Sequence, residues 1–154
     1  MTIKPAFLLS ALLLAAAPVA LAEERTEFEQ AARELYQSVI EIRSAKGQGH
    51  IPELVDYLVG ELKAGGFADA DIMVTDHEIA GEKVQGLMVW YRANGAPKQK
   101  PIVLLAHMDV VDALPDTWTR YPFDLIEEDG YFFGRGTADN KYGVTSLVAT
   151  FLRL

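Results

Sequence analysis

The sequence has 154 residues, 50% of them hydrophobic, and its 22 acidic and 14 basic residues give a formal net charge of -8. This is enough apolar material for one globular domain, but not for two large ones. The acidic balance argues against binding to nucleic acid, because proteins that bind the phosphate backbone need a clustered basic surface. The sequence contains no cysteine, which excludes disulfides, thiolate metal ligands and a cysteine nucleophile. Any metal must therefore be bound by His, Asp and Glu side chains.

The first 22 residues have the pattern of a secretory signal peptide. Lys4 precedes an apolar stretch from Phe7 to Ala17, and the segment ends in Ala20-Leu21-Ala22, whose small residues suit a signal peptidase. The stretch is shorter than the ~20 residues needed to span a bilayer, and Pro18 would interrupt a helix. We therefore expect cleavage after Ala22 and a secreted or periplasmic protein with no stable membrane anchor; an uncleaved anchor is the alternative.

Two amphipathic helices are predicted next. Between Glu24 and Arg43, apolar residues recur at spacings of three and four, which is typical of a helix that packs along one face. A second helix is expected to begin near Pro52, because proline is tolerated in the first helical turn, and to end at Gly65-Gly66.

Strands are predicted in the central part of the chain. Residues 71–75 form a short candidate strand, and residues 84–92 a longer one that is rich in β-forming side chains. Residues 101–106, PIVLLA, are almost continuously apolar. This pattern predicts a strand that is buried on both faces of an α/β sheet.

The last part of the chain is predicted to be a hairpin followed by a helix. Asp129-Gly130 favours the positive φ angles of a tight turn, and it lies between the candidate strands 123–128 and 131–133. From residue 141 to 154, apolar residues again follow helical spacing, and this stripe runs to the last residue without a capping glycine or proline. We therefore expect the chain to be cut inside a larger domain.

Of the three histidines, His107 has the context of a functional residue. It follows the predicted buried strand, at the carboxyl end where α/β sheets place their ligands. Residues two apart in an extended segment point to the same side, so the Asp109 carboxylate can orient the His107 ring; a histidine held by an aspartate for structural reasons is the alternative. His50 and His77 are interpreted as surface residues, because His50 has no acidic partner at a telling spacing and His77-Glu78 lacks the second histidine of an H-E-x-x-H zinc helix.

A second cluster, GRGTADNK, occupies residues 134–141. Its two glycines resemble the start of a dinucleotide-binding loop, but Asp139 stands at the third glycine position and the cluster follows a hairpin, which argues against that function. The glycines instead indicate a backbone that turns closely beneath Asp139 at the start of a helix; a simple N-cap role is the alternative. Glu127, Glu128 and Asp129 are interpreted as solvated hairpin residues. With no G-x-S-x-G elbow and no P-loop in the sequence, metal-assisted hydrolysis is the chemistry that remains.

Several short blocks, taken in their order and spacing, resemble the N-terminal part of the M20 family of metallopeptidases, which includes carboxypeptidase S, aminoacylase and dipeptidase-like enzymes. The blocks are HMDVV at 107–111, Trp118, Pro122-Phe123, DGY at 129–131 and GRGTADNK at 134–141. The resemblance implies an α/β fold of the zinc-exopeptidase (phosphorylase/hydrolase-like) type, with a mixed sheet flanked by helices. Residues 23–154 would form the incomplete N-terminal portion of that catalytic domain.

The resemblance also implies roles for individual residues. His107 would bind one Zn²⁺, Asp139 would bridge two Zn²⁺ ions, and Asp109 would be the catalytic-site residue that orients His107; Co²⁺ and Mn²⁺ are alternative metals. A cis peptide would follow Asp139, at Asn140, where many relatives carry a second aspartate. The general-base glutamate and the remaining ligands of the family would lie beyond this chain. Because zinc usually takes three or four protein ligands, we expect the fragment alone to bind metal weakly and to be inactive.

We therefore expect the parent protein to be an exported dizinc peptidase that cleaves peptide or N-acyl amino acid amide bonds with metal-activated water. Two alternatives remain: an N-acyl amino acid amidohydrolase that is not a peptidase, and a non-catalytic secreted binding module with the same fold. The expected partners are the peptide or N-acyl amino acid substrate and, through a domain outside this chain, a second copy in a homodimer. No nucleic acid partner is expected.

Overall fold

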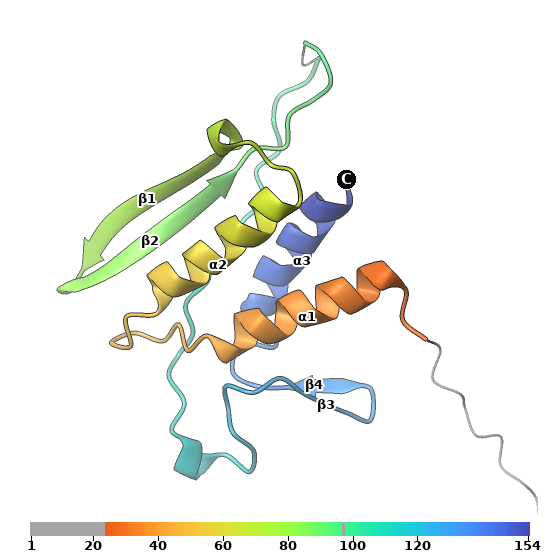
Figure 1. The fold of residues 1–154 in the computed structure, drawn as a ribbon. Coiled ribbons are helices and arrows are strands. Elements are labelled where there is room, and N and C mark those ends of the chain that lie inside the picture. The colour runs from red at the N-terminus through yellow and green to blue at the C-terminus, as the bar shows by residue number, and fades with distance from the viewer. Residues whose placement is uncertain (1–23, 97) are drawn as a thin grey trace, which may run out of the picture.

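The computed structural model describes residues 24–96 and 98–154, and the predicted signal peptide at 1–22 lies outside the described residues. Helices and antiparallel hairpins make up the described chain (Figure 1). The helices are α1 (Glu27–Glu41), α2 (Ile51–Ala64) and α3 (Lys141–Arg153); the strands are β1 (Ile72–Ile79), β2 (Glu82–Val89), β3 (Ile126–Glu128) and β4 (Tyr131–Phe133); and short 3-10 turns cover Asp69–Asp71 and Pro115–Thr117. None of the helices in the described ranges combines the length and apolarity that a membrane crossing requires.

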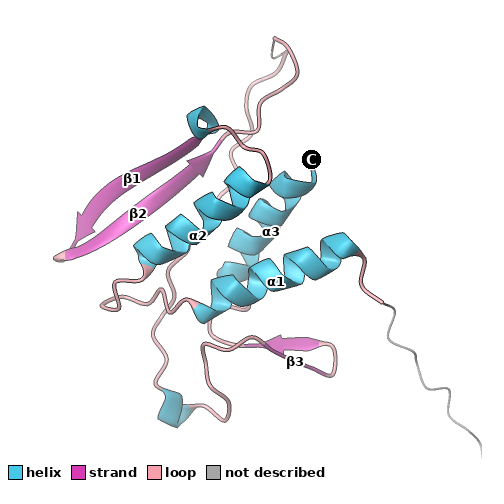
Figure 2. Ribbon diagram, in the orientation of Figure 1, coloured by secondary structure: helices cyan, strands magenta, loops and turns pink. Residues whose placement is uncertain are grey.

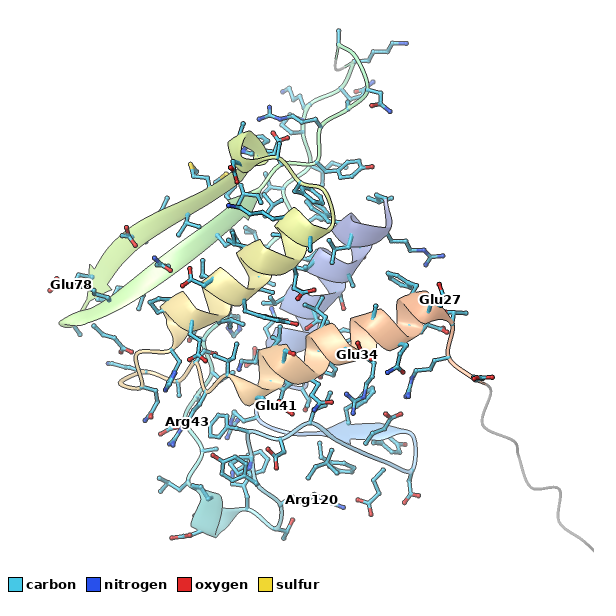
Figure 3. The ribbon with its side chains drawn as sticks, viewed as in Figure 1. Glu27, Glu34, Glu41, Arg43, Glu78 and Arg120 are labelled. Atoms are coloured by element: carbon cyan, nitrogen blue, oxygen red, sulfur yellow. The ribbon has the colours of Figure 1, made fainter. Side chains whose placement is uncertain are left out.

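Helix α1 begins at a capping box, which explains why it starts later than the apolar spacing predicts. The Thr26 hydroxyl accepts a hydrogen bond from the Glu29 backbone N–H at 3.3 Å, and the Thr26 N–H donates to the Glu29 carboxylate at 2.8 Å. Exposed glutamates occupy the outer side of the helix, and three of them are labelled in Figure 3: Glu27, Glu34 and Glu41. The predicted helix is confirmed as amphipathic.

The main core lies where the three helices meet. Its buried side chains come from all three helices: Leu35 and Val39 of α1, Leu54, Leu58 and Leu62 of α2, and Val144, Val148 and Ala149 of α3. Burying each of the larger aliphatic side chains contributes about 1.5 to 3 kcal/mol. Helix α1 crosses the lower part of α3, and the β1–β2 hairpin runs alongside α2 (Figures 1 and 2).

Both hairpins follow from the chemistry of their turns. In the β3–β4 hairpin, Asp129 and Gly130 adopt φ angles of 53° and 78° and Glu128 pairs with Tyr131. The predicted hairpin and its turn are confirmed, but its first strand begins at Ile126 and not at residue 123. In the β1–β2 hairpin, Ala80 and Gly81 adopt φ angles of 54° and 82°. The first strand therefore continues to this turn at residue 79, well beyond the predicted end at residue 75.

The prediction of a doubly buried strand at 101–106 is wrong. This segment has no regular secondary structure, and its aliphatic side chains are 56 to 87% exposed: Ile102, Val103, Leu104 and Leu105. Apolar composition favours a strand, but a strand forms only where neighbours accept and donate its backbone hydrogen bonds. Within residues 24–96 and 98–154, the strands pair only as the two hairpins, so these residues do not join a mixed sheet.

Candidate metal site

The three residues singled out from the sequence lie together. The Nε2 atom of His107 is 2.9 Å from Oδ1 of Asp139, which lies 32 positions later in the chain. On the other side of the ring, Nδ1 is 3.0 Å from the Asp109 backbone carbonyl and 3.3 Å from the Asp109 carboxylate. The side chains of His107 and Asp139 are 49% and 88% exposed, so solvent ions can reach both.

The oxygen atoms around His107 control its protonation. The hydrogen bond to Asp139 raises the pKa of His107 most strongly; partial burial opposes this shift, and the Asp109 carbonyl and the two carboxylate charges add to it. Because Nδ1 faces only acceptors of Asp109, Nδ1 is the nitrogen that would carry the proton when Nε2 binds a metal. The geometry therefore presents one imidazole nitrogen and one carboxylate to the same point.

His107 and Asp109 are positioned by the turn that follows α1. Ser44 is fully buried, and its hydroxyl donates to the Met108 carbonyl at 2.6 Å. The Ser44 carbonyl accepts from the Val110 N–H at 3.2 Å, next to a parallel bridge between Ala45 and Val110. The segment that carries the histidine is thus attached to the residues that follow α1. The bridge at Val110 is the strand-like pairing found here, whereas the sequence predicts a longer strand at residues 101–106.

Asp139 is positioned by the loop that precedes α3. Gly136 adopts a φ of 96°, and a Cβ there would lie 2.9 Å from the Lys141 side chain and 3.0 Å from Val110, so only glycine fits. The cis peptide expected between Asp139 and Asn140 is present. The N-cap of α3 is Asn140, so the alternative of a simple N-cap role for Asp139 is wrong.

Two buried residues near this loop were missed by the sequence analysis. The Lys141 amine donates to the backbone carbonyls of Ile40 and Ile42, and burial lowers the pKa of Lys141 to about 8. The Tyr36 hydroxyl donates to the Thr137 carbonyl at 2.8 Å, and burial raises the pKa of Tyr36 to about 12. Lys141 shares a helical face with the apolar residues of α3, and a lysine in such a stripe could have been recognised as buried.

The other two histidines lie elsewhere on the surface. Nε2 of His77 is 3.0 Å from the Thr75 hydroxyl on β1. Nδ1 of His50 is 2.6 Å from the Glu53 carboxylate, so the view that His50 lacks an acidic partner is wrong. The spacing of three residues brings the two side chains together across the first turn of α2.

The acidic residues of the β3–β4 hairpin are not merely solvated. Glu127 forms ion pairs with Arg25 and with Arg33, and the two guanidinium groups lower the pKa of Glu127 against the opposing effect of burial. Glu128 pairs with Arg120, which is labelled in Figure 3. The hairpin is therefore attached to α1 and to the loop before β3.

The donor set in the described part of the chain is small. Within residues 24–96 and 98–154, no three His, Asp or Glu side chains gather into a group that could hold a metal ion. His107 and Asp139 can supply two protein ligands, whereas zinc usually takes three or four.

Comparison with known proteins shows which family the C-terminal part of the chain resembles. Residues 103–154 match the model of Peptidase family M20/M25/M40. The chain is 38% identical over 98 residues to the succinyl-diaminopimelate desuccinylase of Psychrobacter sp., a match that covers 62% of this chain and 24% of that protein. It is 51% identical over 45 residues to the N-fatty-acyl-amino acid synthase/hydrolase PM20D1 of Bos taurus, covering 29% of this chain and 9% of that protein. The chain thus spans about a quarter or less of these curated relatives.

Solved structures show the same fold. The di-peptidase Dug1p from Saccharomyces cerevisiae superposes with a TM-score of 0.66 at 20% sequence identity, over 80% of this chain and 28% of that one. Human carnosine dipeptidase 1 superposes with a TM-score of 0.59 at 20% identity, over 81% of this chain and 29% of that one. The predicted resemblance to the M20 family and the α/β fold class are both confirmed.

Proposed function

We propose that residues 23–154 form the N-terminal portion of an M20-type catalytic domain, and that the whole protein is an exported, zinc-dependent hydrolase of peptide or N-acyl amino acid amide bonds. The observation that carries the proposal is the contact of His107 Nε2 with Asp139 Oδ1 at 2.9 Å. Both residues lie in the segment that matches the family model. The relatives, named as a desuccinylase, an N-fatty-acyl-amino acid synthase/hydrolase and dipeptidases, support the same class of reaction.

His107 and Asp139 are residue types that bind zinc. An imidazole nitrogen and a carboxylate oxygen are both common zinc ligands, and the side chains of His107 and Asp139 are both exposed to solvent. His107 would bind one ion and Asp139 would be shared between two; Co²⁺ and Mn²⁺ are alternative metals. When bound, the metal would polarise the scissile carbonyl and lower the pKa of a coordinated water.

In this proposal, the residues of this chain bind the metal and orient its histidine ligand. Asp109 faces Nδ1 of His107 with two acceptors, so it would orient the ring and hold a proton on Nδ1 while Nε2 binds the metal. Asp139 supplies a negative charge beside Nε2. We assign no general base among the described residues, and the glutamate that the family resemblance implies for this role would come from elsewhere in the whole protein.

A second candidate is an N-acyl amino acid amidohydrolase that does not cleave peptides. Two of the relatives favour it, because their names describe a desuccinylase and an N-fatty-acyl-amino acid hydrolase. A zinc-dependent assay of the whole protein with a dipeptide and with an N-acyl amino acid separates the two functions. If neither substrate is hydrolysed after zinc is supplied, the enzyme proposal is wrong and a non-catalytic binding module is favoured.

Zinc binding by this chain is tested by competition with a chromophoric chelator. We expect weak binding by the unaltered chain and loss of binding in His107→Gln and in Asp139→Asn, because each change removes one of two ligands. His77→Gln is the matched control, since His77 lies on β1 outside the site. Equal zinc stoichiometry in His107→Gln and in the unaltered chain would overturn the ligand role of His107.

Location and partners belong to the same proposal. The signal-like pattern of residues 1–22 supports cleavage after Ala22 and a secreted or periplasmic protein without a stable membrane anchor. The net charge of -8 supports a small substrate rather than nucleic acid. A homodimer would form through a domain outside this chain. N-terminal sequencing of the exported protein tests the cleavage, and a mature chain that still begins at Met1 would overturn it.

A further inference from the structure

Lys141, the first residue of α3, is a completely buried lysine at the loop that carries Asp139. Its amine donates to the Ile42 carbonyl and, at 3.4 Å, to the Ile40 carbonyl. These carbonyls lie at the C-terminal end of α1, where carbonyl groups lack partners within the helix and the helix dipole is negative. The amine therefore connects the start of α3 to the end of α1, a region marked by the labels of Glu41 and Arg43 in Figure 3.

The same residue also fastens the loop itself. The Lys141 N–H donates to the Gly136 carbonyl at 3.1 Å, and the Lys141 side chain packs directly against Gly136. One step along the loop, the Thr137 carbonyl accepts a hydrogen bond from Tyr36, which also belongs to α1. Asp139 therefore lies between two residues, Thr137 and Lys141, that are both hydrogen-bonded to α1 or its C-terminal end. The Asp139 side chain itself is 88% exposed and is not fixed by packing.

The end of α1 is a common anchor for both halves of the candidate site. Ser44 holds the segment of His107 and Asp109 through the Met108 carbonyl and the Val110 N–H. Lys141 holds the segment of Asp139 through Ile40 and Ile42. Among residues 24–96 and 98–154, no strand pairing joins the two segments directly, so the distance between the histidine and the aspartate depends on both attachments.

We infer that Lys141 is a positioning residue: by binding the C-terminal carbonyls of α1, it places the Asp139 carboxylate within reach of His107 Nε2. The functional meaning of this inference rests on the proposed zinc site, while its geometric part is independent of metal. Either protonation state of the amine can donate to these carbonyls, so the charge of Lys141 does not decide the argument. A lysine that only stabilised α1 would leave the His107–Asp139 contact unchanged when replaced in a folded protein.

The test measures two quantities in the 154-residue chain. The first is the NMR chemical shifts of the His107 ring nitrogens, at one pH and without metal, and the second is the affinity of the chain for zinc. Lys141→Met removes the amine and keeps an unbranched apolar side chain. We expect the His107 resonances to move toward those of Asp139→Asn, and zinc affinity to fall about tenfold or more, as for other residues that orient ligands. The resonances of His50 and His77 should not move, and Lys46→Met, at an exposed lysine, is the matched control.

Tyr36→Phe provides a second test that does not disturb the buried lysine. It removes only the hydroxyl that binds the Thr137 carbonyl, and it should move the His107 resonances in the same direction by a smaller amount. Tyr131→Phe, at a residue that is 70% exposed on β4, is its control. If Lys141→Met does not fold, Lys141→Gln replaces it, and a folded Lys141→Gln protein with unchanged His107 resonances would overturn the positioning role.

The outcomes separate the inference from the proposed function. A folded Lys141→Met protein with the His107 resonances and zinc affinity of the unaltered chain overturns the positioning role. If the His107 resonances move in Lys141→Met but the unaltered chain binds no zinc through His107 and Asp139, the positioning role stands and the proposed zinc site fails.

Discussion

Replacing Gly143 with alanine should not stabilise the protein, although the same change in most helices is favourable. Gly143 lies in the first turn of α3. A Cβ at this position would overlap Oδ1 of Asn140 and would lie 3.0 Å from its Cγ and 3.2 Å from its Nδ2. Because three atoms of one short side chain are involved, the whole Asn140 amide must move, and Asp139 is its neighbour in the chain.

Two opposing effects set the magnitude. Alanine is favoured over glycine in a helix interior by about 0.8 to 1.0 kcal/mol, whereas inserting a methyl group into occupied space costs about 1 to 3 kcal/mol. Gly60 of α2 is the matched control, because a Cβ there would meet nothing within 4 Å. We therefore expect Gly60→Ala to raise the free energy of unfolding by about 1 kcal/mol, and Gly143→Ala to lie about 1 to 3 kcal/mol below Gly60→Ala.

Urea unfolding of both variants, followed by far-UV circular dichroism, measures this difference. The urea concentrations at the unfolding midpoints are compared. When the variants share the same dependence of unfolding free energy on urea, a change in the midpoint reports a change in stability. If Gly143→Ala stabilises the chain as much as Gly60→Ala, then the Asn140 amide does not lie over Gly143, and the described packing at the start of α3 is wrong.

Three further predictions concern ionisation and metal binding. Because burial raises the pKa of Tyr36 to about 12, the folded protein keeps a proton that the unfolded chain loses near pH 10; the free energy of unfolding should fall from pH 10 toward pH 12, and less steeply in Tyr36→Phe. The Arg43 guanidinium lowers the pKa of Asp112, so this pair should add stability at neutral pH and lose it as acid protonates Asp112; an Arg43→Met variant that is equally destabilised at pH 7 and pH 2 in urea titrations would contradict this. Asp109→Ala should weaken zinc binding in the chelator competition by about tenfold, the lower end of the usual range, because truncation leaves the backbone carbonyl that also holds His107; unchanged affinity would remove Asp109 from the site.

Short sequence patterns predicted the turn of one hairpin and the two ends of α2. Asp129-Gly130 favours a tight turn, and the hairpin is found with its turn at these two residues. Pro52 and Gly65 are found near the two ends of α2, where the sequence predicts them. Each of these features depends on a few adjacent residues, so a single sequence is sufficient to predict them.

Predictions failed where the structure depends on partners distant in the chain. The apolar run at 101–106 has the composition of a buried strand but meets no pairing strand among residues 24–96 and 98–154, and it is exposed. The start of α3 is the opposite case, since Lys141 looks solvent-exposed by residue type and is buried because the end of α1 offers it two carbonyls.

The candidate site combines both kinds of information. The apolar run before His107 and the glycines before Asp139 singled out His107, Asp109 and Asp139, and the family resemblance implied their roles at a metal site. Their meeting could not be derived from spacing, since 32 residues separate the histidine from Asp139. The tertiary structure brings them within 2.9 Å by attaching both segments to the end of α1. The sequence by itself therefore determined which groups can do the chemistry, and long-range packing alone decided where they stand, because burial and hydrogen-bond pairing depend on residues far away in the chain.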